Sequence, residues 1–472
     1  MSTPQSETSN AGAWTEERLA ATALIGILVV AAALRFNGLM TEGLRFDESY
    51  SWDQARSDIP TLFVRTFRDN YPPLHNLILW SAMHLTGEAE WSLRWPSVLL
   101  GIATVAITFF IGRRYGGLPV AIAASVLLAV SPVFIWYSQD GRMYPLFAFG
   151  SALLCLAILR YAEHPGRRRA AIAALATLIL LYSHILAPIT WVALAGIGLF
   201  VIPRGGRRNF ILWQAGAWLL FAPWLLVSLR QTGKILKAGF WIPPISPQSF
   251  FDQLAQLAGG PLPLIALAAT VVLGLWPSRA RATSLPHKAL LVTWLALPVA
   301  ALTLISVFVL PMFLARYMVA LLPCLYLLAA IGVVRLADQT RPSRPLAVFA
   351  AALIGLSLTL GQGLPARPDW RHAAQFVASN LRPGDCVSVL PSWDEVPLNY
   401  YFRHDATCGL TKDWTPASLD LRSRMILVVG EPGDPTGISR TAEIRQLMNA
   451  AGWNEIRLPY LLIDIYVFSR EG

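Results

Sequence analysis

The sequence predicts an α-helical protein that spans a membrane many times and carries a small α/β domain in its C-terminal part. Of the 472 residues, 55% are hydrophobic and only 14% are charged, whereas soluble proteins have about 25% charged residues. The hydrophobic residues form runs of about 20, the length that crosses a hydrocarbon core. The basic residues lie in short clusters between these runs. This distribution excludes a nucleic-acid-binding protein, which would gather basic residues on one soluble face.

Eleven hydrophobic runs are predicted to be membrane-spanning helices. The first run lacks a small-residue cleavage site and follows a polar stretch with little positive charge. We therefore expect it to stay in the membrane as the first span, and not to be removed as a signal peptide. The predicted spans are residues 19–38, 95–112, 118–136, 143–160, 170–183, 185–202, 210–228, 261–276, 288–309, 316–335 and 346–362.

The distribution of arginine and lysine predicts the orientation in the membrane, because cytoplasmic loops carry an excess of these residues. With a cytoplasmic N-terminus, five short inner loops hold fifteen basic residues. The short outer loops hold only Arg142, Arg230, Lys234, Lys237 and Arg316. The first outer loop and the chain after the last span are then predicted to face away from the cytoplasm.

Two segments are too polar or too long to lie in lipid, and they set the predicted domain boundaries. The first is the outer loop 39–94, where ESYSWDQAR and PTLFVRTFRDN are typical of short amphipathic helices on a membrane surface. The second is the tail, so we divide the chain into a transmembrane domain, 1–362, and an extracytoplasmic domain, 363–472. In the tail, DWRHAAQFVASNL and AEIRQLMNAAGW are predicted to be helices, and CVSVL and MILVVG are predicted to be strands.

The four cysteines agree with this organisation. Cys155 and Cys324 fall inside predicted spans, where they act as small apolar residues. Cys386 and Cys408 both lie in the tail, where an oxidising compartment permits a disulfide, and the sequence leaves open whether they form one. The cysteine spacings do not resemble a zinc site.

Polar residues gather at the predicted outer ends of the spans. Keeping ionisable groups at membrane depth costs free energy, so such residues indicate function. Few ionisable groups lie near the middle of the spans, which argues against a transport path. The residues at the outer ends are Arg45, Asp47, Glu48, Asp69, Asn70, Tyr71, His75, Gln139, Asp140, Arg142, Tyr144, Tyr182, His184, Arg316 and Tyr317.

Carboxylates and guanidiniums on one membrane face favour a reaction on a phosphate-bearing lipid. The planar guanidinium of arginine holds phosphate oxygens through paired hydrogen bonds. A carboxylate accepts a proton from an attacking hydroxyl as a general base.

Seven sequence strings together resemble the GT-C membrane glycosyltransferases, specifically the bacterial members of glycosyltransferase family 39 that are similar to protein O-mannosyltransferases. The resemblance covers nearly the whole chain in the family's order. The chain departs from the family at Tyr71 and His75, because relatives commonly have His at the first of these positions and Tyr at the second. The strings are LRFDESYSW at 44–52, DNYPPLHNLILW at 69–80, SLRWPSVLLG at 92–101, SQDGRMYPLFAF at 138–149, YSH at 182–184, FLARYMVALLP at 313–323 and PDWRHAAQFV at 368–377.

The resemblance implies the GT-C fold and an inverting transferase in the bacterial plasma (inner) membrane, with its active site on the extracytoplasmic side. The implied donor is a sugar, such as mannose or another hexose or pentose, linked to polyprenyl phosphate. The acceptor is a hydroxyl of a glycan, a lipid or a protein. The first carboxylate of the Asp-Glu pair, Asp47, is implied to be the catalytic base. No cofactor is expected. A divalent cation is possible but is not predicted, because isolated acids do not make a metal site.

The remaining candidates are given roles by position and residue type. Glu48 is predicted to share the catalytic site as an orienting or acceptor-side group, since it points about 100° away from Asp47 in a helix. The residues predicted to bind the phosphate or the lipid of the donor are Arg142, Tyr144, Arg316, Tyr317 and Arg45. The residues predicted to bind the acceptor or the donor are Asp69, Tyr71, His75 and His184.

Structural explanations compete with these roles. Asp47 would also suit the first turn of a surface helix, where the helix dipole favours an acid. Arg142 could simply extend to the membrane interface, and His184 could be an ordinary interfacial histidine. Two other functions also stay open: a flippase or transporter of lipid-linked sugars, and a non-catalytic partner in envelope assembly. The sequence does not identify the sugar, the acceptor or the oligomeric state.

Overall fold

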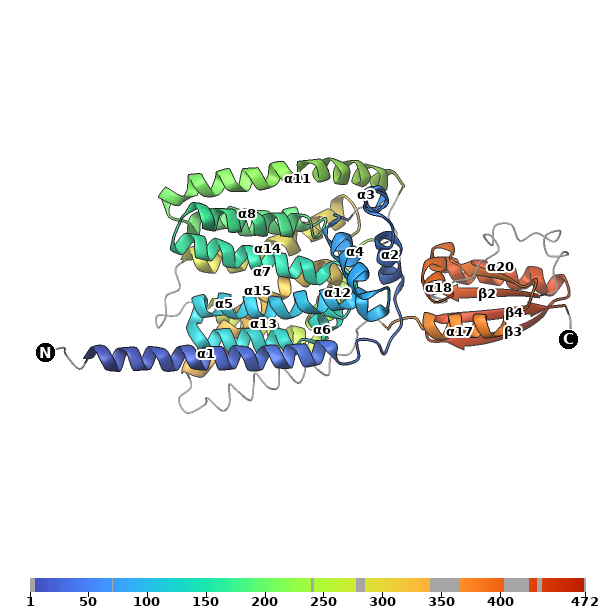
Figure 1. Ribbon diagram of the computed structural model, residues 1–472, viewed down its shortest axis with the longest axis horizontal. Coiled ribbons are helices and arrows are strands. Elements are labelled where there is room, and N and C mark those ends of the chain that lie inside the picture. Colours follow the sequence, from blue (N-terminus) through green and yellow to red (C-terminus); the bar gives the residue numbers. More distant parts are fainter. Residues whose placement is uncertain are drawn as a thin grey trace. The chain divides into compact units, whose positions relative to one another are not determined.

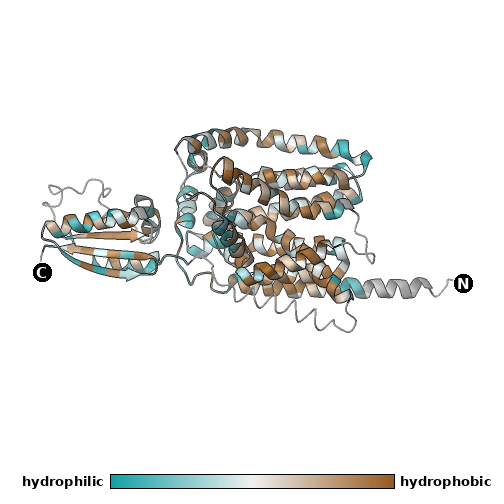
Figure 2. Cartoon of the chain, turned by 180° about the vertical axis from the view of Figure 1, so that it is seen from behind, coloured by the Kyte–Doolittle hydropathy of each residue, from teal (hydrophilic) through white to brown (hydrophobic). Residues whose placement is uncertain are grey.

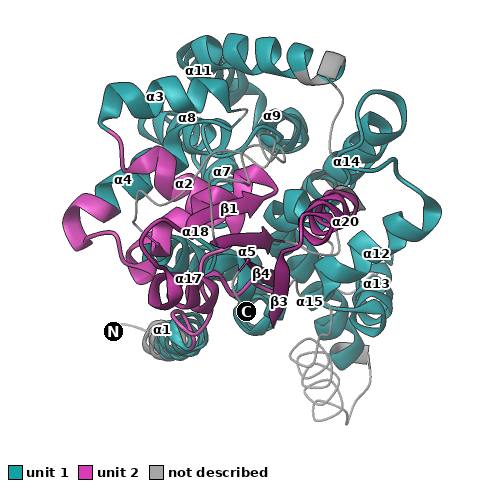
Figure 3. Ribbon diagram, turned by 90° about the vertical axis from the view of Figure 1, so that its right-hand side faces the viewer, with its two compact units in different colours: residues 1–37, 58–82, 94–364 teal, residues 38–57, 83–93, 365–472 magenta. Residues whose placement is uncertain are grey.

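The structure is a computed structural model that describes residues 5–69, 71–238, 242–276, 285–339, 366–402, 424–430 and 435–470. The chain forms two compact units, shown in different colours in Figure 3. Unit 1 comprises residues 1–37, 58–82 and 94–364, and unit 2 comprises residues 38–57, 83–93 and 365–472.

Unit 1 is a bundle of hydrophobic helices, most of which run side by side (Figures 1 and 2). The short helices α3 and α4 lie at one end of this bundle (Figure 1). The helices of the bundle and its ends are α1 (Gln5–Phe36), α3 (Ile59–Arg68), α4 (Leu74–Thr86), α5 (Glu90–Val130), α6 (Pro132–Ser138), α7 (Tyr144–Glu163), α8 (Arg167–Leu181), α9 (Ala187–Trp191), the π-helical turn η1 (Val192–Gly196), α10 (Ile197–Val201), α11 (Arg204–Ala238), α12 (Pro247–Ala258), α13 (Pro261–Leu275), α14 (Leu285–Phe308), the 3₁₀ segment η2 (Ala315–Leu321) and α15 (Leu322–Gln339).

Ten of the eleven predicted spans coincide with these helices, and the fold class is confirmed. The eleventh, 346–362, lies outside the described residues. Six described helices are long and apolar enough to cross a membrane, or up to seven if α12 and α13, bent by 79°, form one span. This number is below eleven because α8 has only 15 residues, the segment Ala187–Val201 is equally short, and α5 contains two predicted spans in one helix.

The two spans within α5 meet at a glycine pair. Gly116 and Gly117 have non-helical backbone angles, and Gly117 has a φ of 69°. Glycine reaches this left-handed region without steric cost. The chain therefore turns at this pair, and α5 consists of two helical halves that meet there. The turn lies in the predicted inner loop after Arg113 and Arg114, as the sequence suggests.

Close packing between α13 and α15 depends on two other glycines. A Cβ atom at Gly274 would lie 2.5 Å from the carbonyl oxygen of Leu328, and one at Gly332 would collide with the backbone of Thr270. Small residues let membrane helices approach closely, because helix association in lipid depends on van der Waals packing. A larger side chain at either glycine would force these two helices apart.

Unit 2 contains a four-stranded sheet of β1 (Cys386–Leu390), β2 (Arg424–Gly430), β3 (Asn454–Tyr460) and β4 (Ile463–Ser469) in the order β1-β2-β4-β3. β1 and β2 are parallel, and the other neighbours are antiparallel. Successive strand residues face opposite sides of a sheet. On β2, Ile426 and Val428 therefore pack with α17 (Trp370–Asn380) and α18 (Glu395–Tyr401), while Met425 and Leu427 pack with α20 (Pro435–Ala450).

The tail's two predicted helices and two predicted strands are all present, as α17, α20, β1 and β2. Strands β3 and β4 were not predicted. The exposed residues of β3 alternate with half-buried ones, so its sequence carries a weak hydrophobic signal. The structure records Cys386 as disulfide-bonded; Cys408, its expected partner, lies outside the described residues.

The division into units differs from the predicted domains 1–362 and 363–472. The boundary after residue 364 agrees closely, but unit 2 also takes in 38–57, with helix α2 (Phe46–Ala55), and 83–93. The physical reason is that loop side chains are buried against the tail. Trp52 is 2% exposed, and its ring meets that of Tyr400 edge-on with centroids 5.0 Å apart.

Candidate active site

Residues of unit 1 that are far apart in the sequence form one cluster of rings and guanidiniums. We call it the His184 cluster, because the ring of His184 contacts most of its members. It contains residues from the segment before α4, from the start of α7, from the turn between α8 and α9, and from η2. The members are Tyr71, Arg142, Tyr144, Phe147, His184, Arg316 and Tyr317.

The His184 ring is enclosed by aromatic rings. It stacks on Phe147 with a centroid distance of 4.7 Å and an angle of 7° between the planes. The rings of Tyr317, Tyr71 and Tyr144 have centroids 5.5, 5.9 and 6.1 Å from it. His184 is fully buried, so its orientation is fixed by packing on several sides.

Hydrogen bonding fixes the tautomer of His184. The backbone N–H of Leu186 donates to Nδ1 at 3.2 Å, so Nε2 carries the hydrogen in the neutral ring. Within the described residues, Nε2 is buried and has no hydrogen-bond partner. Burial, followed by the charges of Arg142 and Arg316, lowers the pKa of His184 to about 3. His184 is therefore a neutral donor, and its buried Nε2–H has no partner among the described residues.

Two guanidiniums lie close enough to His184 to affect its titration. The Arg142 Cζ lies 5.3 Å from the centre of the Tyr71 ring, and the Arg316 Cζ lies 6.0 Å from that of Tyr317. Arg142 is buried and Arg316 is half-buried. Two cations and a neutral N–H donor in a low-dielectric surrounding form an environment that favours an anion such as phosphate.

The loop that carries Arg142 is held by residues outside the cluster. His75 Nε2 donates to the carbonyl oxygen of Gly141 at 3.0 Å, because a carbonyl can only accept. The Ser97 hydroxyl donates to the Arg142 carbonyl at 3.3 Å. Burial, followed by the charge of Arg142, lowers the pKa of His75 to about 3. His75 is therefore uncharged, and its hydrogen bond to Gly141 holds the loop in place.

The segment that carries Arg316 is held from α12. The Gln253 side-chain oxygen accepts from the Ala315 N–H at 2.7 Å, at the start of η2. Next to it, Tyr317 contributes its ring to the cluster, and its hydroxyl lies 3.5 Å from that of Tyr71. This distance is at the upper limit of a hydrogen bond.

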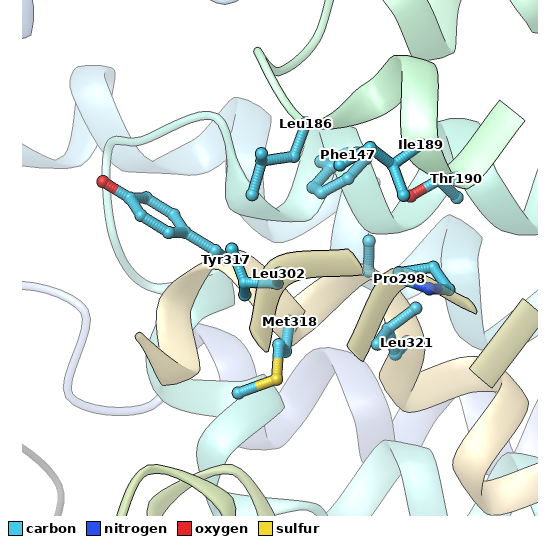
Figure 4. A pocket seen from close by; sticks show the side chains of 10 residues that line it. Phe147, Leu186, Ile189, Thr190, Pro298, Leu302, Tyr317, Met318 and Leu321 are labelled. Atoms are coloured by element: carbon cyan, nitrogen blue, oxygen red, sulfur yellow. The ribbon is translucent and has the colours of Figure 1, made fainter. Parts of the chain in front are cut away.

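A small apolar pocket adjoins the cluster, because the cluster residues Phe147 and Tyr317 belong to its wall (Figure 4). The Tyr317 hydroxyl points away from the other labelled side chains (Figure 4). Except for Tyr317 and Thr190, the lining side chains are hydrophobic, so the wall of the pocket is apolar. The full lining is Phe147, Leu186, Ile189, Thr190, Pro298, Leu302, Tyr317, Met318, Ala320 and Leu321.

The predicted catalytic carboxylates lie in unit 2, at the start of α2. Arg45 precedes the helix as its N-cap residue, and Asp47 and Glu48 occupy the first turn. Asp47 is half-buried, whereas Glu48 is 1% exposed. The Glu48 carboxylate accepts from the Arg45 N–H at 3.1 Å and from Arg367 at 2.8 Å. The two neighbouring acids therefore have different surroundings.

Asp69, another predicted binding residue, is the C-cap residue of α3 in unit 1 and is half-buried. Asn70, which follows it, lies outside the described residues. Among the described residues, no group of three or more His, Cys, Asp or Glu side chains is arranged to hold a metal ion. The independence from metal stays a prediction.

Sequence reasoning missed three contributors. Phe147 stacks on His184, but its spacing in a hydrophobic helix resembles that of any core residue. The Gly141 carbonyl carries no side-chain signal. Arg367 pairs with Glu48 across 319 residues of sequence, so no local spacing connects them. The only available signal was that Arg367 stands beside PDWRHAAQFV, a string shared with the family.

The chain is similar to known glycosyltransferases in sequence pattern and in fold. The family model described as dolichyl-phosphate-mannose-protein mannosyltransferase matches residues 70–228, a range that includes Tyr71, His75, Arg142 and His184. A search of curated proteins found no match.

Solved structures match over most of the chain. ArnT from Cupriavidus metallidurans, bound to undecaprenyl phosphate, has 15% identity and a TM-score of 0.61, with 94% of this chain and 97% of that chain covered. The oligosaccharyltransferase AglB from Archaeoglobus fulgidus, in complex with an inhibitory peptide and a dolichol-phosphate, has 12% identity and a TM-score of 0.52, with 94% and 73% covered. Arabinofuranosyltransferase AftD from Mycobacteria has 15% identity and a TM-score of 0.50, with 95% and 41% covered.

These matches confirm the resemblance found in the sequence. At 12–15% identity, the solved structures establish the fold, and the family model adds a sequence pattern across the first helices of unit 1. The chain therefore has the GT-C fold of membrane glycosyltransferases, and its residues 70–228 carry the pattern of the protein mannosyltransferase family.

Proposed function

We propose that the protein is an inverting glycosyltransferase that uses a polyprenyl-phosphate-linked sugar. It transfers the sugar to an acceptor hydroxyl on the extracytoplasmic face of the bacterial inner membrane. The observation that carries the proposal is the His184 cluster: it combines Arg142 and Arg316 with a buried, neutral N–H donor. This combination suits a phosphate group at membrane depth.

The ligands of the matched structures support the choice of donor. ArnT was solved with undecaprenyl phosphate, and AglB was solved with a dolichol-phosphate. Both ligands are polyprenyl phosphates.

In the proposed reaction, Asp47 accepts the proton of the acceptor hydroxyl while its oxygen attacks the anomeric carbon of the sugar. The new carbon–oxygen bond forms on the face opposite the phosphate, so the configuration inverts. The bond from the anomeric carbon to the phosphate oxygen breaks, and its electron pair leaves with polyprenyl phosphate. Arg142 and Arg316 stabilise the charge that develops on this leaving group. Phosphate is a fair leaving group, so no separate general acid is required.

The family description names mannose, so polyprenyl-phosphate mannose is the first donor to try, followed by other hexoses and pentoses. The acceptor is proposed as a hydroxyl of a glycan, a lipid or a protein. A crude envelope extract contains all three classes and therefore serves as the acceptor in a first assay.

The proposal is tested by measuring free polyprenyl phosphate when the purified protein in lipid receives a panel of donors and the extract. Asp47→Asn is expected to lower the release about 10²- to 10⁴-fold, the usual contribution of a general base. Asp53→Asn is the matched control, because Asp53 lies in the same helix and pairs with Arg56 at the surface. It should release polyprenyl phosphate at the wild-type rate.

The outcomes separate the alternatives. Release that depends on Asp47 supports a transferase. If Asp47→Asn keeps more than about a tenth of the rate, Asp47 is not the general base. If no donor is cleaved but lipid-linked sugars cross the bilayer, the protein is a transporter and the proposed function is wrong.

A further inference from the structure

The first turn of α2, which carries Asp47, is held on both sides by residues of the tail. All the groups involved belong to unit 2. We call this arrangement the α2–tail contact and define it by three sets of interactions: Glu48 with Arg367, Leu44 with Tyr401, and Trp52 with Tyr400.

The first set is a buried ion pair. Arg367 Nη1 lies 2.8 Å from Glu48 Oε2, and the exposed fractions of the two side chains are 5% and 0%. The Arg367 Nε lies 3.1 Å from Glu42, which is more exposed. The same Glu48 oxygen accepts from the Arg45 N–H at 3.1 Å. Arg367 therefore contacts Glu48, the residue that follows Asp47, and the same Glu48 carboxylate also holds the backbone N–H of Arg45, the residue that precedes α2.

The second set holds the chain just before α2. The Leu44 N–H donates to the Tyr401 hydroxyl at 2.7 Å. That hydroxyl in turn donates to Glu90, which also pairs with Arg371. Burial and the Glu90 carboxylate raise the pKa of Tyr401, so the hydroxyl keeps the proton that it donates.

The third set holds the far side of α2. Trp52 Nε1 donates to the Glu88 carboxylate at 3.0 Å, and the Tyr400 hydroxyl donates to the Glu88 carbonyl at 2.7 Å. Because the Trp52 and Tyr400 rings also meet edge-on, the helix is fixed both by packing and by hydrogen bonds.

A buried ion pair is weak evidence for stability, because desolvation of both charges offsets their attraction. Such pairs do fix a particular arrangement in some proteins. Here the pair lies within one turn of a half-buried acid to which the proposed function assigns proton transfer. Small displacements of such a group have large effects on rate, of about 100-fold per 1 Å.

We propose that Arg367 is a positioning residue for sugar transfer: through its ion pair with Glu48, it fixes the first turn of α2 and with it the Asp47 carboxylate. This inference rests on the proposed function. It makes Glu48 the group through which the tail acts, and it gives the tail a part in turnover without a catalytic residue of its own.

The first experiment measures hydrogen exchange in the full-length protein in lipid and needs no activity. Arg367→Met is expected to speed the exchange of amides in residues 44–56, including the Ser49 amide that bonds to the Arg45 carbonyl. The matched control is Arg424→Met, which removes another largely buried ion pair of the tail, that with Asp385 at 2.8 Å. It should leave the exchange of 44–56 unchanged. Unchanged exchange in Arg367→Met would overturn the proposal.

The second experiment is a double-mutant cycle on turnover. Arg367→Met is expected to lower kcat about 10- to 100-fold with unchanged affinity for polyprenyl phosphate, and Arg367→Lys should restore part of it. In the Asp47→Asn background, Arg367→Met should cause no further loss, because the residue that it positions is absent. An equal fold loss in both backgrounds, or an equal loss in Arg424→Met, would show a general structural role and overturn the proposal.

The two experiments separate the failure of this inference from the failure of the proposed function. If the wild-type protein cleaves no donor, the proposed function is wrong, and the role of Arg367 in transfer is wrong with it. If the wild-type protein cleaves a donor but Arg367→Met turns over normally, only the positioning role is wrong.

Discussion

The His184 cluster and the α2–tail contact are both buried polar arrangements, but their polar groups are satisfied differently. In the cluster, the cations Arg142 and Arg316 lie among aromatic rings, and the buried Nε2 of His184 has no partner among the described residues. In the α2–tail contact, cations meet carboxylates, as Arg367 meets Glu48. The first arrangement leaves one buried donor, the Nε2–H of His184, without a partner in the described part of the chain, whereas the Glu48 carboxylate of the second accepts hydrogen bonds from Arg367 and from the Arg45 N–H.

This difference separates binding from support. Native proteins hydrogen-bond nearly all of their buried polar groups, so an exception needs an explanation. A hydrogen bond from the Nε2–H of His184 to an oxygen of a bound ligand would explain this exception. The Glu48 carboxylate needs no such explanation, because Arg367 and the Arg45 N–H already bind it. The variants below test this contrast, from the largest expected effect to the smallest.

Removal of a cluster guanidinium should have the largest effect. Arg316→Ala is expected to weaken the binding of polyprenyl phosphate about 10- to 150-fold, since a charge-assisted hydrogen bond contributes about 1.5–3 kcal/mol. Titration of the protein in detergent with the lipid phosphate measures the effect. Arg230→Ala removes an exposed arginine from α11 and should bind normally. Equal affinities for wild type and Arg316→Ala would show that the cluster is not the phosphate site.

The His184 side chain allows a test of its two nitrogens separately. Asparagine places a polar atom near the position of Nδ1, and glutamine places one near Nε2. If Nε2–H binds the donor, His184→Gln should keep more affinity than His184→Asn, which is expected to lose about tenfold for one hydrogen bond. The same titration checks this order. The reverse order would mean that the bond from Leu186 to Nδ1 is the important one and that His184 is a structural residue.

The sequence predicted the cluster better than the α2–tail contact, for a physical reason. Arg142, His184 and Arg316 stood out because polar groups are costly at membrane depth, and each lies at the end of a hydrophobic run. Their convergence followed from placing the span ends on one membrane face. Glu48 and Arg367 lie in polar segments, where a charge needs no explanation. Their pairing depends on how the tail folds, and strands β3 and β4 of that tail were themselves not predicted.

The pH dependence distinguishes the cluster from an ordinary histidine site. The pKa of His184 is lowered to about 3 from 6.5, mainly by burial. Donor affinity should therefore be constant from about pH 8 to pH 5, because the ring stays neutral and the phosphodiester keeps one charge. The folded state binds fewer protons than the unfolded chain below pH 6.5, so stability should fall as the pH drops from about 6.5 towards 3. Affinity that rises below pH 6.5 would show a charged His184.

Loss of the Tyr71 hydroxyl should have the smallest effect. Tyr71→Phe keeps the ring that faces Arg142 and His184 and removes only the contact to the Tyr317 hydroxyl, which at 3.5 Å is marginal. Donor affinity should change less than about threefold, within the range of one weak hydrogen bond. Tyr71→Leu, which also removes the aromatic face, should weaken binding more, because it removes the cation–π contact that holds Arg142. If both variants lose affinity equally and strongly, the hydroxyl itself contacts the donor. The cluster would then bind its ligand through a tyrosine as well as through His184 and the arginines.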